Sequence, residues 1–331
     1  MINPDKKLQH LLWRAGFGAT VQDMQAYKNQ SITKVVDQLF AKSAQVKPLK
    51  VASGKPPERQ KIRMMSRDER RAMRRQSRQQ VRQLNTAWVE RMVDGQNSLR
   101  EKMTYFWHGH FACQNRNIYF IQNQINTIRK HALGNFRDLV MAIAKDPAML
   151  LFLNNQQNRK QHPNENFARE LMELFTLGRG NYTEKDIKEA ARAFTGWGIN
   201  RRTYEFRFQK RFHDFGSKTF LGKTGNFNGE DVIDIILKQE QTAKFIAEKI
   251  YCFFVNDVPD QRIIDRLGRQ FYQSNYNIGA LMRTIFTSGW FYQKQNIGAK
   301  IKSPVELLVG LRRNFDIDFN KKNASLFIQI V

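Results

Sequence analysis

Pro163-Asn164-Glu165-Asn166-Phe167-Ala168-Arg169-Glu170-Leu171-Met172-Glu173-Leu174-Phe175-Thr176-Leu177-Gly178 holds the densest set of helix and site-like signals in the sequence. It predicts one helix with clear ends, because Asn164 is a favoured N-cap residue and Gly178 readily takes the left-handed conformation that ends helices. At about 100° per residue, the apolar face of this helix consists of Phe167, Leu171, Leu174 and Phe175. An element with such a face needs other elements to cover it, so the stretch favours a helical fold.

A polar stripe made of Asn166, Glu170 and Glu173 lies beside that apolar face. A partly buried carboxylate at Glu170 must be paired, metal-bound or protonated, because an unpaired buried charge costs several kcal/mol. One interpretation is a ligand or general acid/base site built on Glu170 and Glu173, with Arg169 holding an anion. The other is that Arg169, Glu170 and Glu173 form solvated or structural ion pairs, and the stripe alone leaves both open.

Composition bounds the class of protein. The 331 residues include 41% hydrophobic residues and 25 Phe, which is enough for a substantial core. The net charge of +25 favours association with polyanions such as nucleic acid or an anionic surface. Cys113 and Cys252 form neither a disulfide framework nor a zinc spacing. Because no apolar run approaches a membrane span and the N-terminus lacks a signal-peptide core, we expect a protein of a reducing compartment, cytoplasmic by default.

A basic segment follows a linker within residues 44–82. Pro and Gly near residues 48–57 are typical of a linker, and eleven Lys or Arg between Lys55 and Arg82 face only three acidic residues. Ser66 and Glu69 make a capping box, which predicts a helix from about residue 67 into the nineties. This basic arm either grips phosphates or is a solvated helix paired with acidic residues elsewhere. The candidate polyanion-binding residues are Arg70, Arg71, Arg74, Arg75 and Arg78.

Histidines occur in two further blocks. In Leu99 to Phe111, helical spacing places His110 on the apolar face with Phe106 and Trp107, and His108 on the opposite side. His110 is therefore the better candidate for a site, although a histidine on an apolar face can equally be a satisfied core residue. Alternating aromatic and polar residues from Tyr204 to Phe208 predict a strand, and the hairpin expected near 203–222 carries His213 and Asp214.

Several spaced blocks together resemble a bacterial family known as "domain of unknown function 1800". They are the stretch ending at Gly178, the opening His10 to Gly18, the block around His108-Gly109-His110, Thr195-Gly196-Trp197 and His213-Asp214. The resemblance implies a mostly helical protein and no established activity. It also implies that the chain is C-terminally shortened and that a partner could come from the genomically adjacent "domain of unknown function 1501" family. The matching polar or aromatic positions are Trp107, His108, His110, Asn164, Glu165, Asn166, Arg169, Glu170, Glu173, Trp197, His213 and Asp214.

From these observations we expect one mainly α domain with a small β-hairpin insertion. The leading functional hypothesis is a metal-dependent, hydrolase-like enzyme in which the hairpin brings His213 or Asp214 near Glu170, Glu173 and His110. Imidazole and carboxylate ligands suit a divalent metal that activates water. The alternative is a non-enzymatic polyanion-binding or scaffold protein that acts through residues 59–82.

Overall fold

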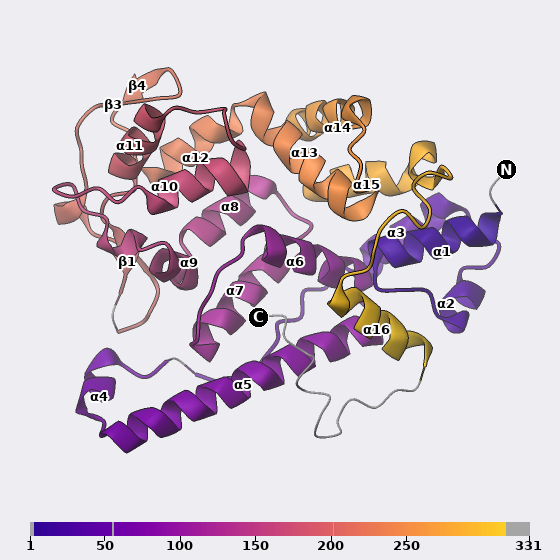
Figure 1. Cartoon of the computed structure of the whole chain (residues 1–331), viewed down its shortest axis with the longest axis horizontal. Coiled ribbons are helices and arrows are strands. Elements are labelled where there is room, and N and C mark those ends of the chain that lie inside the picture. The colour runs from indigo at the N-terminus through magenta and orange to yellow at the C-terminus, as the bar shows by residue number, and fades with distance from the viewer. Residues whose placement is uncertain (1–2, 55, 201, 316–331) are drawn as a thin grey trace.

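The computed structural model describes residues 3–54, 56–200 and 202–315, and it is mainly helical, as the sequence predicts. The first helices are α1 (Pro4–Ala15), α2 (Val21–Ala26), α3 (Ile32–Lys42), α4 (Arg59–Met64), α5 (Arg67–Asp94), α6 (Ser98–His110), α7 (Ile118–His131), α8 (Phe136–Ala144) and α9 (Pro147–Phe152) (Figure 1). They are followed by α10 (Asn166–Glu170), α11 (Glu184–Ala193), α12 (Gly229–Leu237), α13 (Glu240–Phe254), α14 (Gln261–Gln273), α15 (Ile278–Thr287) and α16 (Pro304–Asn314). None of these described helices is long and apolar enough to cross a membrane.

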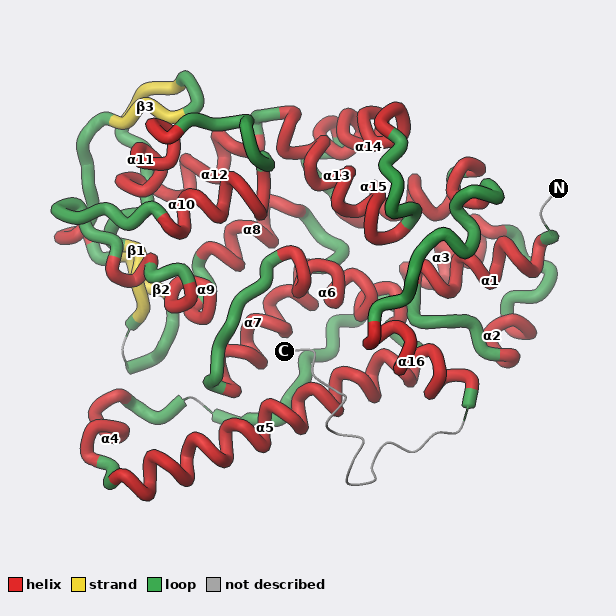
Figure 2. Tube along the Cα trace, in the orientation of Figure 1, coloured by secondary structure: helices red, strands yellow, loops and turns green. Residues whose placement is uncertain are grey.

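The β structure is small, as predicted, but it consists of two separate antiparallel pairs (Figure 2). Strand β1 (Trp197–Ile199) pairs with β2 (Phe206–Phe208), with Trp197 opposite Phe208. Strand β3 (Lys218–Phe220) pairs with β4 (Lys223–Gly225). The predicted hairpin near 203–222 therefore corresponds to the second strand of one pair and the first of the next.

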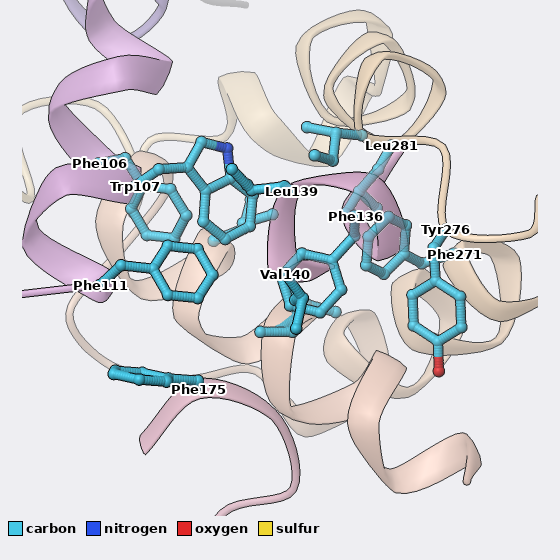
Figure 3. Close-up of a cluster of buried hydrophobic side chains, with 14 of the residues drawn as sticks. Phe106, Trp107, Phe111, Phe136, Leu139, Val140, Phe175, Phe271, Tyr276 and Leu281 are labelled. Atoms are coloured by element: carbon cyan, nitrogen blue, oxygen red, sulfur yellow. The ribbon is translucent and has the colours of Figure 1, made fainter. Parts of the chain in front are cut away.

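An aromatic core joins helices that are distant in the sequence (Figure 3). Trp107 of α6 lies 5.4 Å from Phe136 of α8, and Phe136 in turn lies 6.1 Å from Tyr276, between ring centroids. Phe111 and Phe175 meet in the same cluster at 5.3 Å. Because aromatic side chains bury large areas, this cluster fixes the packing of α6 against α8 and the segment before α15.

A buried ion pair lies beside this core, where α5, α6 and α7 meet. Arg129 donates from Nε to Glu101 Oε1 and from Nη2 to Glu101 Oε2, each at 2.9 Å. Trp88 Nε1 donates to the same Oε2 at 2.8 Å. Arg129 is 0% and Glu101 1% exposed, so both charges have left water and depend on each other.

Helix α5 carries the basic arm, and its predicted start is confirmed. Ser66 and Glu69 form the capping box, and the helix ends at Gly95, which has φ of 72°. The helix buries Leu84, Trp88 and Met92 in its second half, whereas no residue of its first half is buried. Figure 1 shows the first half extending along one edge of the molecule, with α4 folded back at its end.

The segment predicted as one regular helix changes its hydrogen bonding halfway. After α10, residues Leu171–Thr176 form a π-helix, η2, in which Leu177 N donates to Met172 O at 2.9 Å. A π-turn holds more residues than an α-turn, so spacing of 100° per residue fails beyond Glu170. Leu174 was assigned to the apolar face, and that assignment is wrong: the side chain is 49% exposed. Gly178 ends the segment with φ of 78°, as expected.

Candidate functional site

The carboxylates of Glu170 and Glu173, in the segment from Pro163 to Gly178, differ in their partners. Glu173 Oε1 accepts from Arg179 Nε at 2.5 Å and Glu173 Oε2 accepts from Tyr182 Oη at 3.2 Å. The hydrogen bond from Arg179 lowers the pKa of Glu173. Glu170 has no hydrogen-bond or ion-pair partner among the described residues, and partial burial together with the Glu173 charge raises its pKa. These two carboxylates therefore have different environments, which is the condition for different acid/base roles.

Arg169 is engaged by acidic residues of its own surroundings. It donates from Nη1 and Nη2 to Glu184 at 2.8 Å each and from Nη2 to Glu165 at 3.3 Å. The hydrogen bonds to Glu184 raise the pKa of Arg169. The pair is largely exposed, with 37% of the Arg169 side chain and 68% of the Glu184 side chain accessible, so it contributes little to stability. The ion-pair interpretation describes this residue.

The two asparagines of the stretch shape the turn before α10. Asn164 Oδ1 accepts from the Asn166 backbone N at 3.0 Å. Asn164 was predicted as the N-cap, but the N-cap residue of α10 is Glu165, which makes no side-chain capping bond. The Asn164 backbone N donates to Asn158 Oδ1 at 2.9 Å, and Asn158 is 2% exposed. These contacts tie the start of the segment to the loop after α9.

The histidines of α6 lie on different sides of the helix. His110 Nε2 lies 3.1 Å from Phe175 O, and burial lowers the pKa of His110 to about 4. The His108 ring lies 5.4 Å from the Trp88 ring, edge to face, and burial also lowers its pKa to about 4. Both imidazoles are neutral at pH 7, and each packs in an aromatic environment.

His213 and Asp214 are held by the end of α11. His213 is 2% exposed, and its Nδ1 lies 2.8 Å from Thr195 O. Asp214 Oδ2 accepts from Arg192 Nε at 2.7 Å, and that hydrogen bond lowers the Asp214 pKa. These two residues lie between the two strand pairs, whereas Trp197 belongs to β1 of the first pair, with its ring 5.1 Å from that of Phe206.

The expected convergence of these groups on one metal is not found in the part of the chain that the structure describes. No three His, Cys, Asp or Glu side chains there gather in a way that could hold a metal ion. His110 contacts Phe175, His213 contacts Thr195, and Asp214 contacts Arg192. The metal site stays a prediction that no described contact supports.

The basic arm presents its arginines to solvent. Lys61, Arg63, Arg67, Arg70, Arg71, Arg74, Arg75, Arg78 and Arg82 are all exposed. None of these nine forms an ion pair with a carboxylate within residues 3–54, 56–200 and 202–315. Lys55 and the Arg59 side chain lie outside the described part. The expectation of acidic partners elsewhere in the chain therefore finds no support among these residues.

Six of these arginines occupy one face of α5. At about 100° per residue they fall within roughly 100° of arc, in line with Val89 and Met92, which the helix buries further along its length. We name this set the arginine face; it comprises Arg67, Arg71, Arg74, Arg75, Arg78 and Arg82. Its length is about 22 Å at 1.5 Å per residue. Arg70 lies off this face, because it donates to Met65 O at 3.0 Å and Arg63 O at 3.2 Å and so ties α4 to α5.

A basic cleft of about 1220 Å³ lies between the loop after α9 and the first hairpin. Its arginines are Arg159, Arg202, Arg207 and Arg211, and all four are exposed. The guanidinium carbons of Arg159 and Arg211 lie 4.2 and 4.4 Å from the centre of the Phe212 ring. Tyr204, which also lines the cleft, donates from Oη to Pro57 O at 2.9 Å, just before α4. Sequence reasoning missed this cleft, although Lys210-Arg211 was a visible signal of local charge.

Comparison with known protein families places the chain in one of them. The family described as "Protein of unknown function (DUF1800)" matches residues 10–329. No curated protein matches the chain, and no solved structure matches it.

Proposed function

We propose that this chain, which belongs to the DUF1800 family of proteins of unknown function, binds the phosphate backbone of double-helical nucleic acid through the arginine face. The observation that carries the proposal is a row of exposed arginines without a carboxylate partner in the described chain. Neutralising phosphates releases condensed counterions, which drives binding without regard to base sequence.

The residue type supports phosphate as the ligand. The guanidinium group offers a planar set of donors that matches phosphate oxygens in pairs, whereas lysine acts as a point charge. Six arginines and no lysine form the face. No aromatic residue interrupts it, so it lacks the stacking surface that single-strand binders use. A rigid helix of about 22 Å suits a regular duplex.

The basic cleft supports the same proposal from a second element. Arg207 and Arg211 line the cleft together with Tyr204, whose contact with Pro57 joins the cleft to the segment just before α4. A duplex that lies along α5 has in this cleft a second set of cations to contact. Under the proposal, R207Q/R211Q binds duplex more weakly than the native protein at low salt, because the cleft loses two cations while the arginine face stays intact.

The test is the salt dependence of binding to a labelled 20-bp DNA duplex, followed by fluorescence anisotropy. Each phosphate contact contributes a slope of about −0.9 to log K against log[salt]. The variant R71Q/R74Q/R75Q/R78Q reduces the slope by about 3 to 4 if all four contact phosphate. The matched control is K28Q/K34Q/K185Q/K188Q, which removes the same charge from other exposed positions.

The control decides between a docking surface and long-range attraction. Equal loss in both variants means that the net charge of +25 acts without the arm, and the proposal is then wrong. Vesicles with anionic lipid are titrated in parallel. If the protein binds vesicles but not the duplex, and R71Q/R74Q/R75Q/R78Q loses vesicle binding, the ligand of the arm is an anionic membrane surface. The proposal of nucleic-acid binding is then rejected.

The metal-dependent hydrolase remains a separate proposal, in which Glu170 and Glu173 serve as ligand and base and His110 and His213 as ligands. Its support is the free carboxylate of Glu170 beside the paired Glu173. Mass spectrometry of metal content, on protein purified without a metal-affinity tag, tests it against Glu170→Ala. The hydrolase proposal is supported if the native protein contains a stoichiometric amount of metal and the variant does not. It is rejected if neither protein contains metal. A partner from the "domain of unknown function 1501" family also stays a prediction.

A further inference from the structure

A second cavity, of about 760 Å³, lies on the other side of the molecule from the basic cleft, where the first and last described helices meet α6 (Figure 1). Residues of α1, α6 and α13 form its walls together with the loop before α16 and the start of α16 itself. The polar and aromatic lining includes His10, Trp13, Arg14, Lys102, Lys300 and Glu306. Its volume falls in the range of sites for small organic ligands, about 300 to 1,000 Å³.

The charges around this cavity are unbalanced. Five cations line it, Lys6, Arg14, Lys102, Lys300 and Lys302, against the single carboxylate of Glu306. Lys102 is 2% exposed and its Nζ forms an ion pair with Glu306 Oε1. Lys300 forms an ion pair with Asp257, which lies outside the cavity lining. The remaining cations have no carboxylate partner in the described chain, so the cavity attracts an anion.

Arg14, which lines this cavity, has guanidinium N–H groups that make no hydrogen bond within the described chain. Its Nη2 donates to Val255 O at 3.1 Å, and its other guanidinium N–H groups have no hydrogen-bond partner among the described residues. Burial lowers the pKa of Arg14 to about 10, and burial, with a smaller contribution from the charge of Arg14, also lowers the pKa of Lys102 and of Lys300. Cations that destabilise one another are a mark of functional sites, because an anion relieves the repulsion.

His10 adds an unsatisfied polar atom to the wall. The residue is 6% exposed, and its Nε2 has no hydrogen-bond partner. Burial, followed by the charge of Arg14, lowers its pKa to about 4, so the imidazole is neutral at pH 7. A buried polar atom without a partner destabilises the folded chain, and a ligand that hydrogen-bonds to it removes that cost.

The aromatic lining indicates the rest of the ligand. Phe17 and Phe253 line the cavity beside Trp13. The Lys302 ammonium lies 3.7 Å from the centre of the Trp13 ring, and Ile301 on the rim is 90% exposed. Apolar surface next to free cations fits a molecule that has one anionic group and one flat or apolar body.

We propose that this cavity binds a small aromatic anion, with its phosphate or carboxylate group on Arg14 and Lys302 and its ring against Trp13 and Phe253. The site uses none of the residues of the arginine face. It is therefore independent of nucleic-acid binding, and the two can be separated by mutation.

Isothermal titration calorimetry on the full chain at near-physiological salt tests the proposal with phenyl phosphate, benzoate and inorganic phosphate. Phenyl phosphate or benzoate is expected to bind with one molecule per chain and more tightly than inorganic phosphate, because the ring contributes. The difference between phenyl phosphate and benzoate identifies the anionic group. The proposal is rejected if neither phenyl phosphate nor benzoate shows saturable binding up to about 10 mM. That limit corresponds to a binding free energy weaker than about −3 kcal/mol.

Two variants and a control assign any binding to this cavity. K6Q/K302Q changes two exposed side chains, and we expect affinity to fall at least about tenfold, or 1.4 kcal/mol. His10→Leu removes the unpartnered nitrogen, so the chain is expected to be as stable as before or more stable while affinity falls. K28Q/K34Q, with the same change in charge, should bind normally. Unchanged affinity in K6Q/K302Q would overturn the assignment.

Discussion

The buried ion pair between Glu101 and Arg129 supports a quantitative prediction about stability. Glu101→Leu leaves the Arg129 guanidinium, which is 0% exposed, without its carboxylate, and Arg129→Met leaves Glu101 without its cation. Removing one partner of a buried pair costs about 3 to 5 kcal/mol. Because domains are stable by only about 5 to 15 kcal/mol, either change removes a large fraction of the total.

The double variant E101L/R129M should lose much less than the two single variants together. It leaves neither member of this pair as an unpaired charge, and its main defect is Trp88 Nε1, which donates to Glu101 in the native protein and then lacks an acceptor. That unsatisfied donor costs about 1 to 3 kcal/mol. The double-mutant cycle should therefore give a coupling energy of at least about 3 kcal/mol.

Thermal unfolding followed by circular dichroism measures these differences. At about 2.1 cal/mol/K per residue, the unfolding entropy of the 331-residue chain is about 0.7 kcal/mol/K. Each single variant should therefore unfold about 4 to 7 °C below the native protein. Single variants that shift Tm by less than about 1 °C, or a double variant that loses the sum of both, would refute this reasoning.

Three further predictions concern single positions. Asp146 is 3% exposed, and burial raises its pKa from 3.8 to about 7. Between these two pH values the native state binds more protons than the unfolded state. The unfolding free energy should therefore fall by up to about 4 kcal/mol as the pH rises from 3.8 to about 7. Asp146→Asn keeps a good N-cap and should show no such decline in urea unfolding at pH 4 to 8; a parallel decline in both proteins would contradict the prediction. Gly196 has φ of 78°, and a Cβ there would lie 2.7 Å from Gln209 O. Gly196→Ala should therefore lower the unfolding free energy, measured by urea denaturation, by at least about 1 to 2 kcal/mol. An unchanged urea midpoint would count against this prediction. Arg169→Ala removes only exposed ion pairs and should change the unfolding free energy by less than about 1 kcal/mol; a larger loss would mean that the pair with Glu184 is structural.

Signals that act within a few residues were readable from the sequence. The capping box of Ser66 and Glu69 predicted the start of α5, and Thr183 with Asp186 forms a box of the same sequence pattern at α11. These features depend on one turn of backbone, so their physics is local. The predominance of helix followed from the same kind of signal, repeated along the chain.

Features that depend on packing were not readable. In the π-helix after Glu170 the backbone N–H groups bond to carbonyls five residues back, and the spacing of residue types does not reveal this. The wider turn leaves Leu174 exposed and outside the core. The surroundings of His213 come from Thr195, and those of His10 from Phe291 and Tyr292, far along the chain. A candidate site assembled from single side chains therefore could not be located before the fold was known.

The ion pair of Lys102 with Glu306 has a consequence for how the protein is made. The two residues are 204 positions apart, so a ribosome that has just released α6 must add most of the remaining chain before the partner of Lys102 exists. During that time the Lys102 ammonium must stay hydrated, because burying it alone costs several kcal/mol. We therefore expect the wall between α1 and α6 to close only after α16 emerges from the ribosome. Nascent chains stalled before Ser303 should consequently leave α1 open to proteolysis, whereas chains that extend past Asn314 protect it.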